Sequence, residues 1–467
     1  MNKIGVYICN YNGKDFTIGC INSLYEQSVE SFDICVVDNA STDGTVDAIV
    51  SKFPNVKIIA NAENLGGAGG FDNGLKDGIN KGYEYLVLLD NDVLLDKNLL
   101  LNMYEYMESH KDVGIVGAKV MIMDMPDTIQ DYGDFLDFKK FKERNAYSME
   151  KDTSDLPDVN ECDYVPTCCV MVRRGALIDS GTMPADNFIY YDDIELSHKM
   201  KLKGWKVCAL GCAKVWHKGG FRKAAVNTFS RYYFLRNRLN FFAKYINEEQ
   251  VEIFVEQSLD EIFNLLYGFN AKNAKELFET IFYAYDDFIH GVRGKAADYK
   301  IMKLSNAPTP LDIAVSNANK VYINIDDIVD LKNEKEKLWI VHRMICEISR
   351  LNDNIKFYFS YKNSKINIVE LQTQLRMLDE DVCIPDIYEW NKDECYDVVF
   401  EQCNHVSEVK DNILPNVYID KYCNCITNEN EYLYFVSMNQ AREYFKKTYR
   451  KLMHNAILKV RANVIKE

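Results

Sequence analysis

Residues 85–92 read YLVLLDND, and they decide the fold because an apolar run ends there in two carboxylates, Asp90 and Asp92. In an open α/β sheet, ligands bind beyond the carboxyl ends of the strands. Hard oxygen ligands suit Mg²⁺ or Mn²⁺, and such ions usually accompany phosphates. We therefore expect a metal-dependent enzyme acting on a diphosphate. An acidic pair taken alone is more often a solvated turn, so this expectation depends on the rest of the chain.

The sequence around this stretch alternates short apolar runs with helical patterns. The apolar runs are IGVYIC, FDICVVD, VKIIA, YLVLLD and VGIVGAKV, and helices are expected at about 14–27, from about 45 and at about 69–81. This alternation is typical of βαβ units and predicts a Rossmann-like sheet with helices on both faces. The loops CNYNG, DNASTDG, the glycine cluster and DND would then share one edge, where a nucleotide touches all four.

The chain continues beyond this sheet in several parts. Residues 125–161 are charged, with aromatic residues and no clean period, and predict a long excursion or small subdomain. A strand near VPTCCVMV, a helix from about Asp192 and a strand ending at His217 follow. We expect a catalytic domain at 1–228, a helical extension at 229–304 and a smaller α/β domain of unknown role at 305–467.

Composition narrows the class of protein. A chain of 467 residues is long enough for two or three domains. Its formal net charge of −15 argues against a nucleic-acid-binding protein. No apolar run approaches the roughly 18 residues of a membrane span, and the first residues run into a strand without a leader pattern. Fourteen scattered cysteines fit reduced thiols, so we expect a cytoplasmic protein.

The C-terminal residues 441–467 predict a basic amphipathic helix. Eight Lys or Arg residues stand against two Glu in this stretch, with apolar residues at helical spacing. Packing on its own domain is the simpler interpretation. The alternative is peripheral contact with anionic lipids on the inner face of the plasma membrane.

A glycine cluster, NLGGAGGFDNGL, follows the third expected strand. Glycine lets the backbone approach a phosphate or sugar closely, and a following helix N-terminus favours anions. The cluster is neither a P-loop nor the dinucleotide fingerprint. An ordinary flexible turn is the alternative.

Three further positions carry candidate chemistry. Asp38 ends the run FDICVVD and would either accept a hydrogen bond from a base or cap its own turn. Asp192 and Asp193 stand at the expected start of a helix. Helix capping would account for one carboxylate, and the other would serve as a base that deprotonates a hydroxyl. His217 ends the run VWH and would offer nitrogen to a metal, although a lone histidine is more often structural.

The motifs together resemble family 2 glycosyltransferases of the GT-A fold, especially the bacterial galactofuranosyltransferase and rhamnosyltransferase branch. The matching stretches are CNYNG, VVDNASTDGT, NAENLGGAGGFDNGL, LLDND, FIYYDDIEL and VWH, in the family's order, over roughly residues 3–240. The resemblance implies an α/β fold with a mixed sheet flanked by helices.

The resemblance also implies roles for individual residues. Asp193 would be the catalytic base, with Asp192 and Glu195 orienting acceptor or sugar hydroxyls. Asp90, Asp92 and His217 would bind Mn²⁺ or Mg²⁺. The residues expected to bind the nucleotide are Asn10, Tyr11, Asp38, Asn64, Gly66, Gly67, Gly69, Gly70 and Asn91. The middle position of the metal motif, often acidic in the family, is Asn91 here.

The expected activity is inverting, metal-dependent transfer of a sugar to a hydroxyl of a surface polysaccharide or lipid-linked glycan. UDP-galactofuranose is favoured as donor, with dTDP-rhamnose as the alternative, since both bases offer Asp38 the same groups. A non-catalytic sugar-nucleotide-binding protein is the competing class. The segment from Ser230 to Tyr245 would close the site, contact phosphates through Arg236, or pack as a core helix. The C-terminal domain would serve acceptor handling, oligomerisation or docking.

Overall fold

A computed structural model of the chain describes residues 3–29, 31–219, 227–305, 308–324, 334–360, 367–378, 384–402, 416–419, 425–426 and 438–464. The chain divides into two units. The first comprises Met1–Phe254, Tyr283–Met302 and Leu452–Glu467, and the second comprises Val255–Phe282 and Lys303–Lys451.

A ten-stranded mixed sheet forms the centre of the first unit, in the order β10-β12-β6-β11-β4-β1-β2-β3 with β5 on β12 and β7 on β6. Strands β1, β2, β3 and β4 are mutually parallel, whereas β11 runs antiparallel to both β4 and β6. The strand bounds are β1 Ile4–Asn10, β2 Phe32–Asp38, β3 Lys57–Ala60, β4 Tyr85–Asp90, β5 Val93–Leu95, β6 Val113–Ile122, β7 Met125–Asp131, β10 Val159–Glu161, β11 Cys169–Arg173 and β12 Lys206–His217. The predicted mixed α/β sheet is confirmed.

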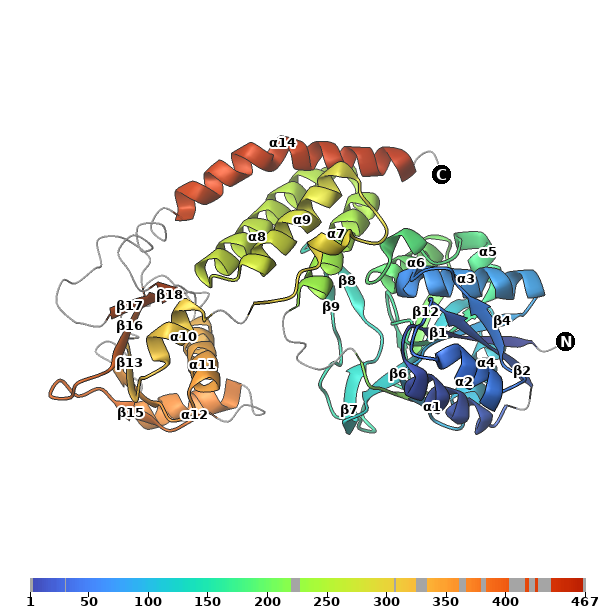
Figure 1. Cartoon of the computed structure of the whole chain (residues 1–467), viewed down its shortest axis with the longest axis horizontal. Helices are drawn as coiled ribbons and strands as arrows, with labels where there is room; N and C mark the ends of the chain where they lie inside the picture. The colour runs from blue at the N-terminus through green and yellow to red at the C-terminus, as the bar shows by residue number, and fades with distance from the viewer. Residues whose placement is uncertain are drawn as a thin grey trace. The chain divides into compact units, whose positions relative to one another are not determined.

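Helices cover both faces of this sheet (Figure 1). One face carries α1 (Lys14–Tyr25), α2 (Thr45–Lys52) and α4 (Leu99–Ser109); the other carries α3 (Gly66–Lys81), α5 (Arg174–Ser180) and α6 (Asp192–Leu202). Because successive side chains of a strand point to opposite faces, β1 contributes to both cores. Ile4, Val6 and Ile8 pack with the first set of helices, and Tyr7 packs with the second.

The glycine cluster lies inside α3 rather than in a loop before it, which corrects the expected helix start near residue 69. Gly66, Gly70, Gly74 and Gly78 recur every fourth residue and therefore share one face of the helix. A Cβ at Gly70 would stand 2.5 Å from Cys9 Sγ, and one at Gly78 would stand 2.3 Å from Leu86 Cδ2. The glycines let α3 lie directly on the sheet, and this packing offsets their low helix propensity.

Residues 125–161 contain short strands, which the sequence did not predict. β7 pairs with β6, while β8 (Phe135–Asp137) and β9 (Lys142–Arg144) form a separate hairpin. β7 reads MPDTIQD and lacks alternation of apolar and polar residues. Backbone hydrogen bonds hold it to β6, and these do not depend on the pattern of side chains. Periodicity therefore gave no signal for this strand.

Three helices follow the sheet, as expected from the sequence between residues 228 and 300: α7 (Thr228–Tyr245), α8 (Val251–Ala271) and α9 (Lys275–His290). The last helix, α14, spans Met438–Val464. Within the second unit its Lys446 and Arg450 pair with Glu256 of α8, and within the first unit Arg461 pairs with Glu248. These contacts favour packing of the basic helix on its own protein, and membrane contact stays a prediction. No helix in the described ranges is long and apolar enough to span a bilayer.

The second unit contains a six-stranded sheet in the order β15-β14-β13-β16-β17-β18, parallel except for the last pair. Its strands are β13 Lys320–Asn324, β14 Lys356–Ser360, β15 Ile387–Glu389, β16 Val398–Gln402, β17 Asn416–Ile419 and β18 Cys425–Ile426. Its further helices are α10 Pro310–Val315, α11 Glu334–Leu351 and α12 Ile368–Leu378. This sheet agrees with the smaller α/β domain expected from the sequence.

Two neighbouring glycines of α3 offer a direct test of the packing argument. Gly66 has φ +73°, and a Cβ there would stand 2.0 Å from the Phe188 carbonyl oxygen, whereas a Cβ at Gly67 meets nothing within 4 Å. We expect Gly66→Ala to lower the free energy of unfolding by about 2 kcal/mol or more, because it adds backbone strain and a clash. Gly67→Ala should leave it unchanged or raise it by up to about 1 kcal/mol. Urea denaturation measures both, and equal losses would contradict the argument.

Candidate active site

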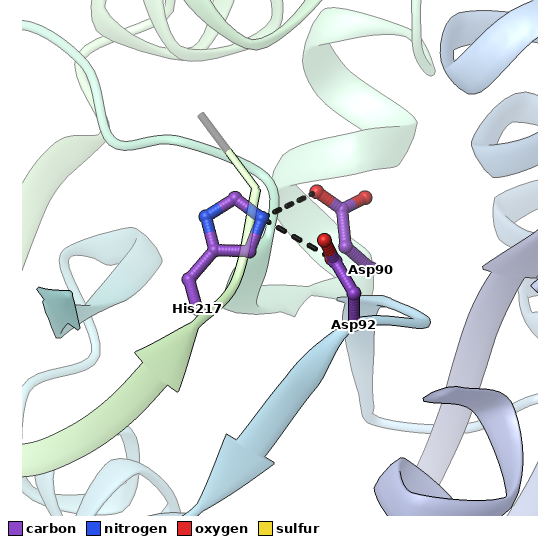
Figure 2. A group of neighbouring side chains, drawn as sticks. All are labelled: Asp90, Asp92 and His217. Atoms are coloured by element: carbon purple, nitrogen blue, oxygen red, sulfur yellow. Dashed lines mark ion pairs between the residues drawn. The ribbon is translucent and has the colours of Figure 1, made fainter. Parts of the chain in front are cut away.

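Asp90, Asp92 and His217 come together at the ends of two strands. Asp90 ends β4, and the chain turns into β5, which pairs antiparallel with the end of β12 so that His217 lies opposite Val93. Figure 2 shows the imidazole ring facing both carboxylates. His217 Nε2 lies 3.2 Å from Asp92 Oδ1 and 3.8 Å from Asp90 Oδ2. The sheet topology thus unites residues that are far apart in the sequence.

The three groups alter one another's ionisation. Burial raises the pKa of Asp90 to about 6, and the charge of Asp92 acts in the same direction. Burial is the largest single effect on Asp92 and opposes its ionisation, but the hydrogen bond with His217, the charge of that imidazole and backbone hydrogen bonds together hold the pKa below its usual value. The same carboxylates hold the pKa of His217 above its usual value despite burial. The cluster therefore concentrates negative charge, which protonation of His217 offsets in part.

The donor set fits a divalent ion. One atom from each of Asp90, Asp92 and His217 lies within 4.8 Å of the others. Two carboxylates and an imidazole are ligands that Mn²⁺ and Mg²⁺ accept, and neighbouring ligands around such an octahedral ion stand roughly 3 Å apart. The measured spacings of 3.2 and 3.8 Å are close to that value.

Gln130 is a residue of this cluster that the sequence analysis missed. Its side-chain amide lies 3.0 Å from His217 Nδ1, on the far side of the ring from the carboxylates. This contact fixes the orientation of the imidazole ring. Gln130 lies in β7, where no periodic pattern or motif distinguishes it.

Asn10, Asp38 and Asn91 form a network at the ends of β1, β2 and β4. Asn10 donates to Asp38 Oδ1 at 2.7 Å, and Asn91 donates to Asn10 Oδ1 at 2.8 Å. Asp38 also accepts from the backbone and hydroxyl of Ser41, so the turn-capping interpretation describes part of its role. Asn10 and Asp38 are buried, while Tyr11 is exposed. Tyr11, which follows Asn10 in the chain, therefore has a ring open to solvent next to this network.

The remaining predicted nucleotide-binding residues surround the start of α3. Asn64 accepts a hydrogen bond from the Gly66 backbone at 2.8 Å and forms the turn into the helix. Packing inside the protein leaves no room for a Cβ at Gly66 or Gly70. A Cβ at Gly69 would likewise stand 2.7 Å from Leu65 Cβ. Gly67 alone of the four faces open space. Binding of a nucleotide by these residues stays a prediction.

Asp192 and Asp193 begin α6, as the sequence predicts. Burial raises the pKa of Asp193 to about 6, against stabilising hydrogen bonds from backbone groups including Ile194 N–H. Burial and the charge of Asp193 raise the pKa of Asp192 as well. Asp134 of the 125–161 region, a buried residue not singled out in the sequence, adds its negative charge to the surroundings of Asp193. An elevated carboxyl pKa is typical of general bases and acids.

The segment before α6 has an unusual backbone. Phe188, Tyr190 and Tyr191 all have positive φ, between 64° and 68°. Residues with side chains rarely adopt this conformation, and each costs about 1–3 kcal/mol unless its surroundings impose it. Strain of this kind directly before two carboxylates marks a functional segment.

Two buried residues of α7 hold this segment. Asn237 donates from Nδ2 to the carbonyls of Asn187, Ile189 and Tyr190 at 2.8 to 3.0 Å. Arg236 donates to Asn187 O at 3.1 Å and to Gly294 O at 2.8 Å. Arg236 is fully buried, which excludes the phosphate contact considered for it and identifies α7 as a core helix with a positioning role.

Glu195 forms an ion pair with a residue of α7. Its Oε1 accepts from Lys244 Nζ at 2.9 Å and from the Tyr245 hydroxyl at 3.0 Å. Only 4% of Glu195 is exposed, so both partners belong to its permanent surroundings. Its predicted contact with acceptor or sugar hydroxyls stays a prediction.

The N-terminal region is similar to known proteins. Residues 5–180 match the family profile described as glycosyl transferase family 2. An Escherichia coli UDP-Glc:α-D-GlcNAc-diphosphoundecaprenol β-1,3-glucosyltransferase is 32% identical over 24% of this chain and 43% of its own length. A Mycobacterium tuberculosis N-acetylglucosaminyl-diphospho-decaprenol L-rhamnosyltransferase is 23% identical over 39% of this chain and 66% of its own. The chain spans less than half of the length of several curated relatives it matches.

Among solved structures, residues 1–349 of Staphylococcus aureus TarS align with a TM-score of 0.42 and 19% identity. The alignment covers 62% of this chain and 81% of that chain.

Removing the Asn237 amide tests whether α7 positions the carboxylates of α6. Asn237→Ala leaves two carbonyls without their donor, so we expect turnover to fall about 10- to 100-fold while the dissociation constant for nucleotide stays within about twofold. Asn227→Ala is the control, because it removes the N-cap of the same helix and costs only about 1 kcal/mol of stability. Equal losses of turnover in the two variants would indicate general destabilisation of α7.

Proposed function

We propose that this protein, whose residues 5–180 belong to glycosyltransferase family 2, transfers a sugar from a nucleotide diphosphate sugar to a hydroxyl of a glycan acceptor. The observation that carries the proposal is the pairing of two acidic sites. A carboxylate–imidazole cluster suited to a divalent ion stands at the ends of β4 and β12, and Asp192 and Asp193 stand at the start of α6. The negative charge of Asp90 contributes to the raised pKa values of both α6 carboxylates, so the two sites lie within electrostatic reach.

The donor would lie across the carboxyl ends of the strands. Asp38, with Asn10 beside it, would recognise the pyrimidine, and the exposed ring of Tyr11 would contact it. The diphosphate would lie toward Asn64, Gly67 and Asn91, with Gly66, Gly69 and Gly70 shaping the adjacent backbone. We favour UDP-galactofuranose as donor and keep dTDP-rhamnose as the alternative, since uridine and thymidine offer the same N3 hydrogen and O4.

In the reaction, Asp193 accepts the proton of the acceptor hydroxyl while that oxygen attacks the anomeric carbon from the face opposite the leaving diphosphate. The bond to the diphosphate breaks, and the product has inverted configuration. Asp90, Asp92 and His217 would hold Mn²⁺ or Mg²⁺, which would stabilise the negative charge on the leaving diphosphate. Asp192 would orient the reacting hydroxyls. The raised pKa of Asp193 makes its carboxylate a stronger base than an exposed aspartate.

The acceptor is proposed from chemistry shared by two relatives. Both carry names in which the acceptor is a sugar on a diphosphate-linked polyprenol. We therefore propose a lipid-linked glycan of a surface polysaccharide as acceptor. Access to such a lipid would be helped by peripheral contact of residues 441–467 with the membrane. The competing class, a binding protein without catalysis, would need no base, and both candidate carboxylates of α6 are present.

Replacement of the base tests the mechanism. Asp193→Asn should lower turnover by about 10²- to 10⁴-fold and leave the nucleotide dissociation constant unchanged, because only the proton acceptor is lost. In the wild type, the base is inactive when protonated, so turnover should decline as pH falls through about 6, and this decline should be less steep in the residual activity of the variant, where Asp90 still titrates near the same pH. Nucleotide diphosphate release measures both. A variant with most of its turnover intact would refute the assignment.

Metal binding is tested separately from activity. We expect Mn²⁺ to bind with a signal in electron paramagnetic resonance that Asp92→Asn weakens at least about tenfold, since one of three protein ligands loses its charge. Asp127→Asn, a change of an exposed aspartate in β7, should leave the affinity unchanged. EDTA should stop sugar transfer, and either Mn²⁺ or Mg²⁺ should restore it. Transfer that persists in EDTA would contradict metal dependence.

A further inference from the structure

A polar cavity lies within the first unit, beside α6, and is lined by residues other than those of the metal cluster. Its volume is about 420 Å³, within the range of roughly 300–1,000 Å³ typical of small-molecule sites. Residues of α6, α7, α9 and α14 line it together with the loops near Pro184 and Gly291. Asp90, Asp92 and His217 are not among the lining residues.

The cavity carries a surplus of positive charge. Its charged lining residues are Lys199, Lys244, Arg293, Lys459, Asp186 and Glu195, which give four cations and two anions. The chain as a whole has a formal net charge of −15, so the sign of the cavity is opposite to that of the whole chain. A concave site with one dominant sign of charge attracts ligands of the opposite sign.

The existing contacts leave donors available in the cavity. Glu195 is paired with Lys244, and Asp186 with Arg293 at 2.9 Å. Arg293 Nη1 is buried and has no hydrogen-bond partner among the described residues. Lys459 is exposed and has no ion-pair partner in the described ranges of the chain. Burial lowers the pKa of Lys199, and although Glu195 opposes this, the charge of Lys244 adds to it. An anion between these groups would accept a hydrogen bond from Arg293 Nη1, pair with Lys459 and stabilise the charge of Lys199.

Helix α6 connects the cavity with Asp192, the residue next to the proposed base. Asp192, Glu195 and Lys199 are three and then four residues apart, so they follow one face of the helix. With a rise of about 1.5 Å per residue, Glu195 and Lys199 stand roughly 5 and 10 Å along the axis from Asp192. This span is comparable to one monosaccharide with an attached phosphate.

We propose that this cavity binds a phosphoryl group, and that the group belongs to the acceptor and anchors it while a sugar hydroxyl faces Asp193. The assignment to the acceptor rests on the proposed function; the phosphoryl chemistry of the cavity does not. A free phosphate or pyrophosphate would use the same lysines and arginine, so the experiment separates the two sources.

Binding of inorganic pyrophosphate to the full chain tests the cavity without any activity. Titration calorimetry in EDTA avoids binding through a divalent ion at the other site. We expect Lys459→Glu to weaken pyrophosphate binding at least about tenfold, equivalent to about 1.4 kcal/mol. Lys451→Glu is the matched control, because Lys451 is an exposed lysine of the same helix outside the cavity. Absence of binding by the wild type, or equal affinity in the two variants, would overturn the proposal.

The source of the phosphoryl group is tested with two acceptors that carry the same glycan, one on a diphosphate lipid analogue and one on a neutral aglycone. We expect Lys459→Glu to raise KM for the diphosphate acceptor at least about tenfold and to leave KM for the neutral acceptor and the donor unchanged. An unchanged KM together with weakened pyrophosphate binding would overturn the assignment to the acceptor and identify a free anion. Failure of the wild type to glycosylate either acceptor would count against the proposed function, while the calorimetry would still decide the cavity.

Discussion

The candidate active site depends on the hydrogen bonds that satisfy the carbonyls of residues 187–191. Asn237 supplies donors to three of them, Arg236 adds a second donor to Asn187, and the Ala68 backbone of α3 donates to Phe188 at 3.1 Å. The Tyr191 carbonyl accepts from Glu195 within α6. Because every carbonyl has a partner, the chain keeps a conformation that it would otherwise avoid. The direction in which α6 starts, and with it Asp192 and Asp193, follows from these bonds.

Crowding of like charges is the second constraint on the site. Asp90, Asp192 and Asp193 come from two separate parts of the chain, and burial together with repulsion between neighbouring carboxylates raises their pKa values. The protein supplies one imidazole, that of His217, close to Asp90 and Asp92. A divalent ion would relieve this repulsion more fully than a proton does, and it would bring a diphosphate into the same space. Binding of the ion and binding of the diphosphate would therefore each favour the other at this edge of the sheet.

Sequence patterns predicted those features that depend on one residue and its own strand or helix. Apolar runs marked β1, β2 and β4, and the polar residues at their ends identified Asn10, Asp38 and Asp90. The union of His217 with Asp92 was expected only through a family resemblance, since strand order is not encoded locally. Gln130 could not be found, because its importance arises from a contact with His217 across two strands. The glycines of α3 did carry a signal in their four-residue spacing, which indicates a helix face rather than a loop.

The glycine face of α3 also affects the position of the segment before α6. With glycine at positions 70, 74 and 78, this helix packs directly on the side chains of Cys9, Tyr7 and Leu86, and a Cβ at any of the three positions would come within about 3 Å of them. Its first turn, at Gly66 and Ala68, is consequently brought against the Phe188 carbonyl. The helix thus lies between the edge of the sheet and the loop that precedes Asp193, and its glycines keep the two close together. The absence of side chains at these glycines therefore helps to set the width of the space in which donor and acceptor would meet.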